Sequence, residues 1–147
     1  MPLLTGRNNE PLNEREILRG ANTFLGLDNN APVRHEAGAA TKFIVTQEAG
    51  EDVPEIVFGP DLYPGRNVVD PNSSLSLEAA AAHELMHLYR WRNKRDLPND
   101  VLAEIDEALT SLEAILRFPK QLGESDIRQL VSDAIQRLNR FVQGQGV

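Results

Sequence analysis

The sequence predicts an α+β fold. Three observations support it: one helical segment near the start of the chain, short β-branched segments in the middle, and three helical segments in the second half. A chain of 147 residues has room for one domain with a hydrophobic core, whereas a second full domain would be cramped. We therefore expect a single domain over residues 1–147, with a short sheet in a small N-terminal mixed region followed by three helices.

The first half of the chain predicts one helix and three short strands. Residues 12–25 carry apolar residues at helical spacing, with Pro11 at the entry and Gly26 at the exit. Residues 28–40 are rich in Asn, Gly and Ala and predict a loop. The predicted strands, each bounded by turn-forming residues, are 41–47, 55–58 and 67–69.

The second half predicts three helices, which cover residues 75–93, residues 98–118 and a last segment from Ser125 onwards. Asn72, Ser73 and Ser74 are candidate N-caps of the first helix, and Ser125 is the candidate cap of the last. Pro119 stops the middle helix. The last helix has an amphipathic apolar stripe that comprises Ile127, Leu130, Val131, Ala134, Ile135, Leu138, Phe141 and Val142.

Composition and charge argue against several classes of function. The net charge of -7 disfavours nucleic acid as a partner, because phosphate binding needs a basic footprint. We interpret the basic cluster Arg90, Arg92, Lys94 and Arg95 as the solvated end of a helix, matched to its dipole. The absence of cysteine excludes disulfides, thiolate metal sites and a cysteine nucleophile.

Targeting features are equally sparse. No apolar stretch is long enough to span a membrane, and the first residues lack the apolar region of a signal peptide. This pattern predicts a cytoplasmic protein without membrane contact. Non-classical export, or delivery into another cell, would leave no such feature and stays open.

The segment His83-Glu84-Leu85-Met86-His87 predicts a metal site on the helix of residues 75–93. Four residues advance about 400° around a helix, so both imidazoles leave one face and can reach one tetrahedral ion. Glu84 is offset by about 100°, where its carboxylate can take a proton from metal-bound water without binding the metal. This HExxH arrangement predicts zinc and metal-assisted hydrolysis. Two unrelated surface histidines are the alternative, but two of only 3 histidines fall in the motif.

A catalytic zinc needs a third protein ligand and an open position for water. No histidine follows His87, so this ligand is a carboxylate or lies upstream. The next predicted helix offers Glu104, Asp106, Glu107 and Glu113.

The two helices together resemble the gluzincin clan of metallopeptidases. The resemblance covers roughly residues 68–117 and depends on the HExxH segment followed by Ile105-Asp106-Glu107-Ala108-Leu109. In that clan a glutamate from a following helix completes the zinc site. The resemblance therefore implies a zincin-like fold with Glu107 as third ligand, twenty residues after His87 (107 minus 87).

Glu104 is the alternative ligand, and the glutamate that does not bind zinc is a candidate acceptor for a histidine N–H. Gluzincins often place an acid four residues after the ligand, and Ser111 departs from this pattern. Asp70-Pro71 before the histidine helix is also similar to small effector-type metalloproteases that bacteria deliver into other cells.

The expected function is a zinc metallopeptidase that acts on a peptide or protein, with Glu84 as general base toward zinc-activated water. An extended substrate would dock on an edge strand, either 41–47 or 55–58. One alternative is a non-catalytic zinc-binding regulatory or interaction domain. Another is a regulatory protease domain like those beside phage repressors. Glu84 favours catalysis, because structural zinc sites use four protein ligands.

The donor that stabilises the transition state is the open question. Many gluzincins use a downstream His or Tyr, and this chain has neither after the histidine helix. The upstream candidates are Tyr63, His35 and Arg66, whereas Tyr89 and Trp91 are interpreted as packing residues.

Overall fold

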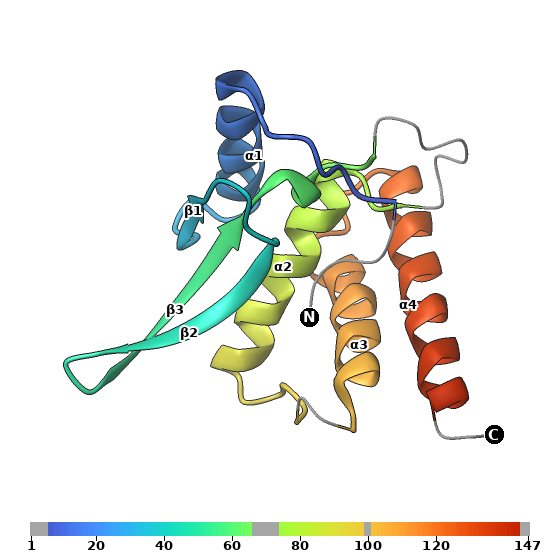
Figure 1. The fold of residues 1–147 in the computed structure, drawn as a ribbon. Coiled ribbons are helices and arrows are strands. Elements are labelled where there is room, and N and C mark those ends of the chain that lie inside the picture. Colours follow the sequence, from blue (N-terminus) through green and yellow to red (C-terminus); the bar gives the residue numbers. More distant parts are fainter. Residues whose placement is uncertain (1–5, 66–73, 99–100, 145–147) are drawn as a thin grey trace.

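A computed structural model describes residues 6–65, 74–98 and 101–144. The fold is mixed α+β, as expected. In chain order the elements are α1 (Glu14–Leu27), β1 (Val33–His35), β2 (Lys42–Glu48), β3 (Glu51–Phe58), the 3-10 helix η1 (Pro60–Leu62), α2 (Leu77–Arg92), α3 (Ala103–Arg117) and α4 (Glu124–Gly144). Figure 1 shows α2 in the middle, with α1 and the sheet on one side and α3 and α4 on the other. In the described ranges, no helix is both long and apolar enough to cross a membrane.

The three strands form one sheet in the order β1-β3-β2. β1 runs parallel to β3, and β2 pairs antiparallel with β3 through a tight hairpin. Ala49 (φ 51°) and Gly50 (φ 81°) form its turn, and two positive φ values match the twist of the strands that they join. The hairpin leaves β2 at an edge of the sheet and β3 in its centre.

The sequence predictions for this half hold in part. α1 begins at Glu14 because Asn13 and Glu16 form a capping box, and it continues through Gly26. The loop prediction for 28–40 was wrong at β1, whose 3 residues are too few for an alternating pattern. β3 starts earlier than predicted. The predicted strand 67–69 lies outside the described residues.

Helix α2 forms the core of the molecule. Ala79 to Ala82, Leu85 and Leu88 are fully buried, as are the polar side chains of His83 and Glu84. A helix buried on nearly all sides has no single apolar face and lies between layers. The central position of α2 therefore places its histidines inside the protein, within reach of the neighbouring helices.

The N-cap of α2 is Ser76, whose Oγ accepts a hydrogen bond from the backbone N of Ala79 at 3.1 Å. The candidate Ser74 was wrong, because its hydroxyl accepts instead from Arg7 at 2.7 Å. Asn72 and Ser73 lie outside the described residues. Ser76 also donates from Oγ to Asp126 at 2.6 Å and from its backbone N to Gln129 at 2.7 Å. These two bonds fix the start of α4 against the start of α2.

Both later helices begin at positions other than those predicted. α3 starts at Ala103, after the predicted start at Pro98. α4 starts at Glu124, so Ser125 lies within its first turn, and Asp126 accepts a hydrogen bond from the backbone N of Gly123 at 2.9 Å. At the start of α4, Ser125 and Asp126 are both residue types that can cap a helix. The sequence alone therefore did not resolve where this helix begins.

The apolar stripe predicted on α4 is only partly buried. Leu130 and Ala134 lie in the core, while the polar residues Gln129, Asp133 and Arg137 are buried beside them. Four residues of the stripe are exposed: Val131, Ile135, Leu138 and Val142. α4 is thus rotated so that a polar row faces the histidine helix.

The interpretation of Arg90 as a solvated residue was wrong. Its side chain is buried, lies 2.7 Å from Asp106 and forms a second ion pair with Glu113. Arg90 also donates to the backbone carbonyl of Arg95 at 2.9 Å. Because Asp106 and Glu113 belong to α3, this buried arginine sets the position of α3 along α2.

Candidate metal centre

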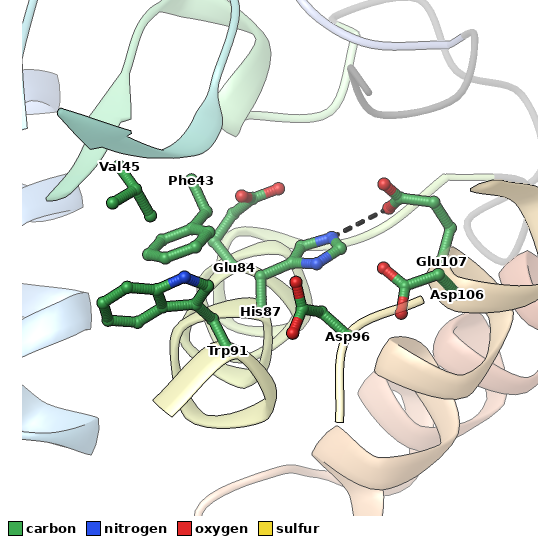
Figure 2. A pocket seen from close by; sticks show the side chains of 8 residues that line it. All are labelled: Phe43, Val45, Glu84, His87, Trp91, Asp96, Asp106 and Glu107. Carbon is green, nitrogen blue, oxygen red and sulfur yellow. Dashed lines mark hydrogen bonds and ion pairs between the residues drawn. The ribbon is translucent and has the colours of Figure 1, made fainter. Parts of the chain in front are cut away.

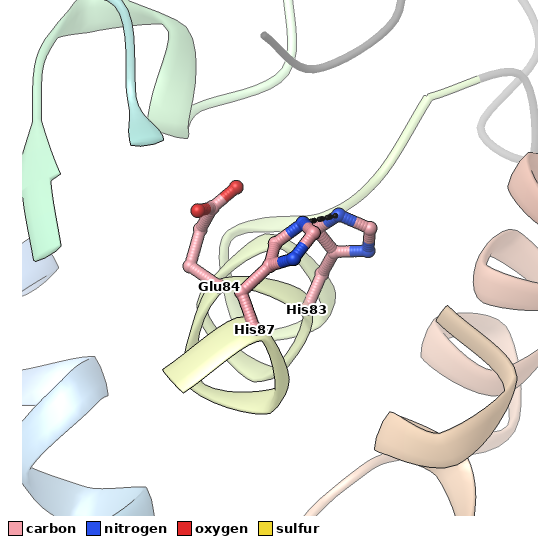
Figure 3. A group of neighbouring side chains, drawn as sticks. All are labelled: His83, Glu84 and His87. Carbon is pink, nitrogen blue, oxygen red and sulfur yellow. Dashed lines mark hydrogen bonds between the residues drawn. The ribbon is translucent and has the colours of Figure 1, made fainter. Parts of the chain in front are cut away.

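The side chains of His83, His87 and Glu107 meet between α2 and α3. Glu107 Oε1 lies 2.9 Å from His83 Nε2 and 2.9 Å from His87 Nε2. The two Nε2 atoms are 3.2 Å apart, and Figure 3 shows their rings turned toward one another. His83 is fully buried and Glu107 is 5% exposed. Helical spacing brings the histidines together, and the Arg90 ion pairs hold α3 where Glu107 can reach both.

The distances between His83 Nε2, His87 Nε2 and Glu107 Oε1 are close to those between the ligand atoms of a zinc ion. Ligand atoms about 2.0 to 2.1 Å from a tetrahedral ion lie roughly 3.3 Å from one another. The three distances of 2.9, 2.9 and 3.2 Å are slightly shorter than this, so a small outward movement of the side chains would accommodate an ion. Three protein ligands would leave a fourth position open.

A hydrogen-bonded chain fixes the orientation of the His83 ring. Ser111 Oγ donates to Asp133 Oδ2 at 2.6 Å, because an ionised carboxylate only accepts. The same Oγ lies 2.8 Å from His83 Nδ1 and must accept from it. His83 is therefore protonated on Nδ1, and burial lowers the pKa of this histidine, which favours the neutral ring. In that form Nε2 carries a lone pair directed at Glu107.

His87 has a weaker version of the same arrangement. Thr110 Oγ donates to the backbone carbonyl of Asp106 at 2.7 Å, so a lone pair of this hydroxyl is left for His87 Nδ1 at 3.5 Å. Both rings thus direct Nε2 toward Glu107 Oε1. Lone pairs on two nitrogens and one carboxylate oxygen repel one another unless protons or a cation lie between them.

The pKa shifts follow from this contact. Burial opposes ionisation of Glu107, but the contacts of its Oε1 with His83 Nε2 and His87 Nε2 outweigh it when a proton lies between them, and they hold the pKa of Glu107 well below its usual range. Burial likewise lowers the pKa of His87, and the contact with Glu107 outweighs it and raises the pKa above its usual value. A negative carboxylate between the two rings therefore needs a positive charge beside it, which a proton on His87 or a bound cation can supply.

Glu104 lies elsewhere. Its Oε1 is 3.9 Å from Arg137 and its Oε2 is 3.8 Å from Arg140, with no hydrogen bond to either histidine. Of the two glutamates considered for the third ligand, the structure brings Glu107 to the histidines. A metal-ligand role for Glu107 stays a prediction.

Two residues near the site were missed in the sequence, Asp133 and Arg137 on α4. Arg137 is fully buried, donates from Nε to Asp133 at 2.9 Å and lies 3.6 Å from Glu107 Oε1. Their polar side chains interrupt an apolar stripe four residues apart, which is the pattern that could have pointed to them. Ser111, which departs from the gluzincin pattern, connects the histidine to an acid on a different helix.

Glu84 lies beside the histidines in a pocket of about 280 Å³. Its side chain is 1% exposed and neither carboxylate oxygen has a hydrogen-bond partner in the described chain. Burial raises the pKa of Glu84 to about 8. A carboxylate oxygen of Glu84 and one ring nitrogen each of His83 and His87 all lie within 4.8 Å of one another. The pocket is lined by Phe43, Val45, Glu84, His87, Trp91, Asp96, Asp106 and Glu107, as Figure 2 shows.

Tyr63 and His35, two of the candidate donors from upstream, do not line this pocket. Tyr63 donates its hydroxyl to the backbone carbonyl of Glu16 at 2.7 Å. The His35 ring packs on Phe58, with ring centres 5.3 Å apart. Arg66 lies outside the described residues. Trp91 was interpreted as a packing residue, but it also lines the pocket.

Comparisons of the chain with known protein families, with curated proteins and with solved structures found no match.

The chain from His83 through Ser111 to Asp133 gives a first prediction. Ser111→Ala removes the acceptor of the His83 N–H, and we expect zinc affinity to fall by about 10- to 100-fold, as for other outer partners of metal-bound histidines. The measurement is a zinc titration against a competing chelator. Ser132→Ala is the matched control, since Ser132 lies next to Asp133 but, among the described residues, its hydroxyl is hydrogen-bonded to Gln136 and not to the histidines. Equal zinc affinity of Ser111→Ala and the parent would contradict the role of this chain.

Proposed function

We propose that this protein is a zinc-dependent hydrolase, and specifically a metallopeptidase. One observation carries the proposal: His83 Nε2, His87 Nε2 and Glu107 Oε1 converge within 3.2 Å of one another, with Glu84 beside them in a pocket. Two imidazoles and one carboxylate are a common ligand set of catalytic zinc. The gluzincin resemblance and a zincin-like fold agree with this set and are part of the proposal.

A bound zinc would supply Lewis acidity, which polarises the substrate carbonyl and lowers the pKa of a water. Glu84 supplies the proton transfers. Its carboxylate is buried without a partner, and a cation beside it favours the ionised form against the burial that raises its pKa. In this form Glu84 takes a proton from the attacking water and then gives it to the leaving amine.

The sheet supports a peptide as substrate. Of the two strands considered for docking, β3 is paired on both sides, whereas β2 lies at the edge. Phe43 and Val45 of β2 line the pocket that holds Glu84. An extended chain paired with the free edge of β2 would therefore pass the pocket, held by backbone hydrogen bonds.

The experiment that tests this assignment compares two glutamates on one helix. Glu107→Ala removes a proposed ligand, so we expect peptide hydrolysis to be lost and zinc affinity to fall by more than roughly 100-fold. That value is the largest usual effect of replacing a residue that only hydrogen-bonds a metal ligand. Glu104→Ala is the matched control, because Glu104 contacts only Arg137 and Arg140 in the described chain. We expect it to change zinc affinity by less than about tenfold. The reverse order would reassign the ligand.

A second candidate function is a non-catalytic zinc-binding domain. The observation that favours it is the pocket lining. Its described residues include no Tyr, and apart from the proposed ligand His87 only Trp91 among them has a neutral side chain with an N–H donor for a developing oxyanion. A fully zinc-loaded protein that cleaves no peptide in a complex library would support this alternative.

A further inference from the structure

The pocket beside Glu84 has two different walls. Phe43, Val45 and Trp91 form an apolar wall, with the rings of Phe43 and Trp91 centred 5.9 Å apart. Asp96, Asp106 and Glu107 line the other side, across His87 in Figure 2. No Lys or Arg lines the pocket among the residues that the structure describes. A side chain that enters the pocket meets an apolar wall on one side and carboxylates on the other.

Three of the four lining carboxylates have other partners or another role. Glu107 contacts the two histidines. Asp106 pairs with Arg90 at 2.7 Å and accepts from the backbone N of Leu97 at 3.0 Å. Glu84 is the proposed base.

Asp96 is different. It is exposed, and within the described chain it forms no hydrogen bond or ion pair. Its nearest basic neighbour in sequence, Arg95, forms an ion pair with Glu113 instead. Arg90 is already paired with Asp106 and Glu113, so it does not compensate the charge of Asp96 either. Asp96 therefore presents an uncompensated negative charge at the pocket.

We propose that this pocket selects a substrate with lysine or arginine next to the scissile bond. Both side chains combine an apolar stem with a cationic end. The stem would lie along Phe43 and Trp91, where a cation also gains from the aromatic faces, and the charge would face Asp96. A volume of about 280 Å³ suits one side chain, since pockets for larger ligands begin near roughly 300 Å³. This inference rests on the proposed peptidase function.

A binding test separates this inference from catalysis. The protein has 1 tryptophan, so Trp91 fluorescence reports occupancy of the pocket. The zinc-loaded Glu84→Gln protein is titrated with N-acetyl-lysine amide and with N-acetyl-norleucine amide, which has the same stem without the charge. We expect the lysine probe to bind more tightly, and the difference to shrink as salt is added. Norleucine amide with a free α-amine is the third probe. If this probe binds more tightly than the lysine probe, the pocket recognises the free α-amine of a substrate N-terminus, and the proposal is wrong.

The assignment to Asp96 is tested by Asp96→Asn in the same background. We expect the ratio of the lysine to the norleucine dissociation constant to rise by about two- to fivefold, the size of one solvent-exposed ion pair. Glu14→Gln is the control, an exposed acid on α1 outside the pocket lining, and should leave the ratio unchanged. An unchanged ratio in Asp96→Asn, or loss of zinc from it, would overturn the proposal.

Hydrolysis gives the independent readout. Peptide pairs that differ only by lysine or norleucine at one position are compared by kcat/KM with the parent protein. Cleavage without preference for lysine would reject the inference and leave the peptidase function intact. Absence of cleavage by the zinc-loaded parent would reject the peptidase function, whatever the probes bind.

Discussion

Glu84→Gln is expected to lower peptide hydrolysis by about 10²- to 10⁴-fold, the usual contribution of a general acid–base. Glutamine keeps the size and shape of the side chain but has no basic oxygen. Because both oxygens of Glu84 lack a hydrogen-bond partner, the substitution breaks no bond in the described chain. Zinc content and thermal stability should therefore stay near those of the parent. Product profiling on a complex peptide library, with metal analysis of the same samples, measures both.

The control for this variant is Glu78→Gln, the same change in the first turn of α2. It should retain hydrolysis. Equal cleavage by Glu84→Gln and the parent would show that Glu84 is not the base, even if the metal site is correct.

Glu84→Gln should also change how the folding stability of the metal-free protein depends on pH. Burial raises the pKa of Glu84 to about 8, above the ordinary glutamate value of 4.5. Between these values the folded chain holds a proton that the unfolded chain releases, so rising pH should destabilise the fold through Glu84. Glu84→Gln should remove this part of the pH dependence, which denaturant unfolding at pH 5 and pH 8 can measure. Parallel stability changes in both proteins would contradict the burial of a protonated Glu84.

Replacing both histidines is expected to abolish zinc binding. The double variant His83→Ala, His87→Ala leaves one carboxylate of the three proposed ligands, which is too few to hold zinc against dilution. Zinc should fall from about one ion per chain to near zero, and hydrolysis should fall with it. The measurement is metal analysis after gel filtration, with circular dichroism to establish that the variant is folded.

His35→Ala is the matched control, since His35 packs on Phe58 and lines a different pocket from His87. It should keep the zinc of the parent. Equal zinc content in the double variant and the parent would disprove the site.

The sequence predicted the parts of the site that follow from local spacing. His83 and His87 share a face because a helix repeats every 3.6 residues, and Glu107 lies on the next helix, where the gluzincin resemblance placed it. The contacts of Ser111 and Asp133 could not be predicted in this way. They join residues from three helices, and their approach depends on how α4 rotates against α2.

The burial of a charged residue was the second feature that could not be predicted from the sequence. Arg90 belongs to a basic cluster that suggested a solvated helix end, and only the positions of Asp106 and Glu113 across the helix interface explain why it is buried. Trp91 follows the metal motif by one turn, so its packing role was predictable from α2 alone. Its place in the pocket depends on β2, a strand that is distant in sequence.

The most direct test of the central claim is an anomalous-scattering map of the zinc-loaded protein, recorded at the zinc edge. We expect one strong peak bonded to His83 Nε2, His87 Nε2 and a carboxylate oxygen of Glu107, at about 2.0 to 2.2 Å from each. The fourth position should hold a solvent molecule near Glu84. A map without a peak between these residues, or with a fourth protein side chain closing the site, would contradict a catalytic zinc centre.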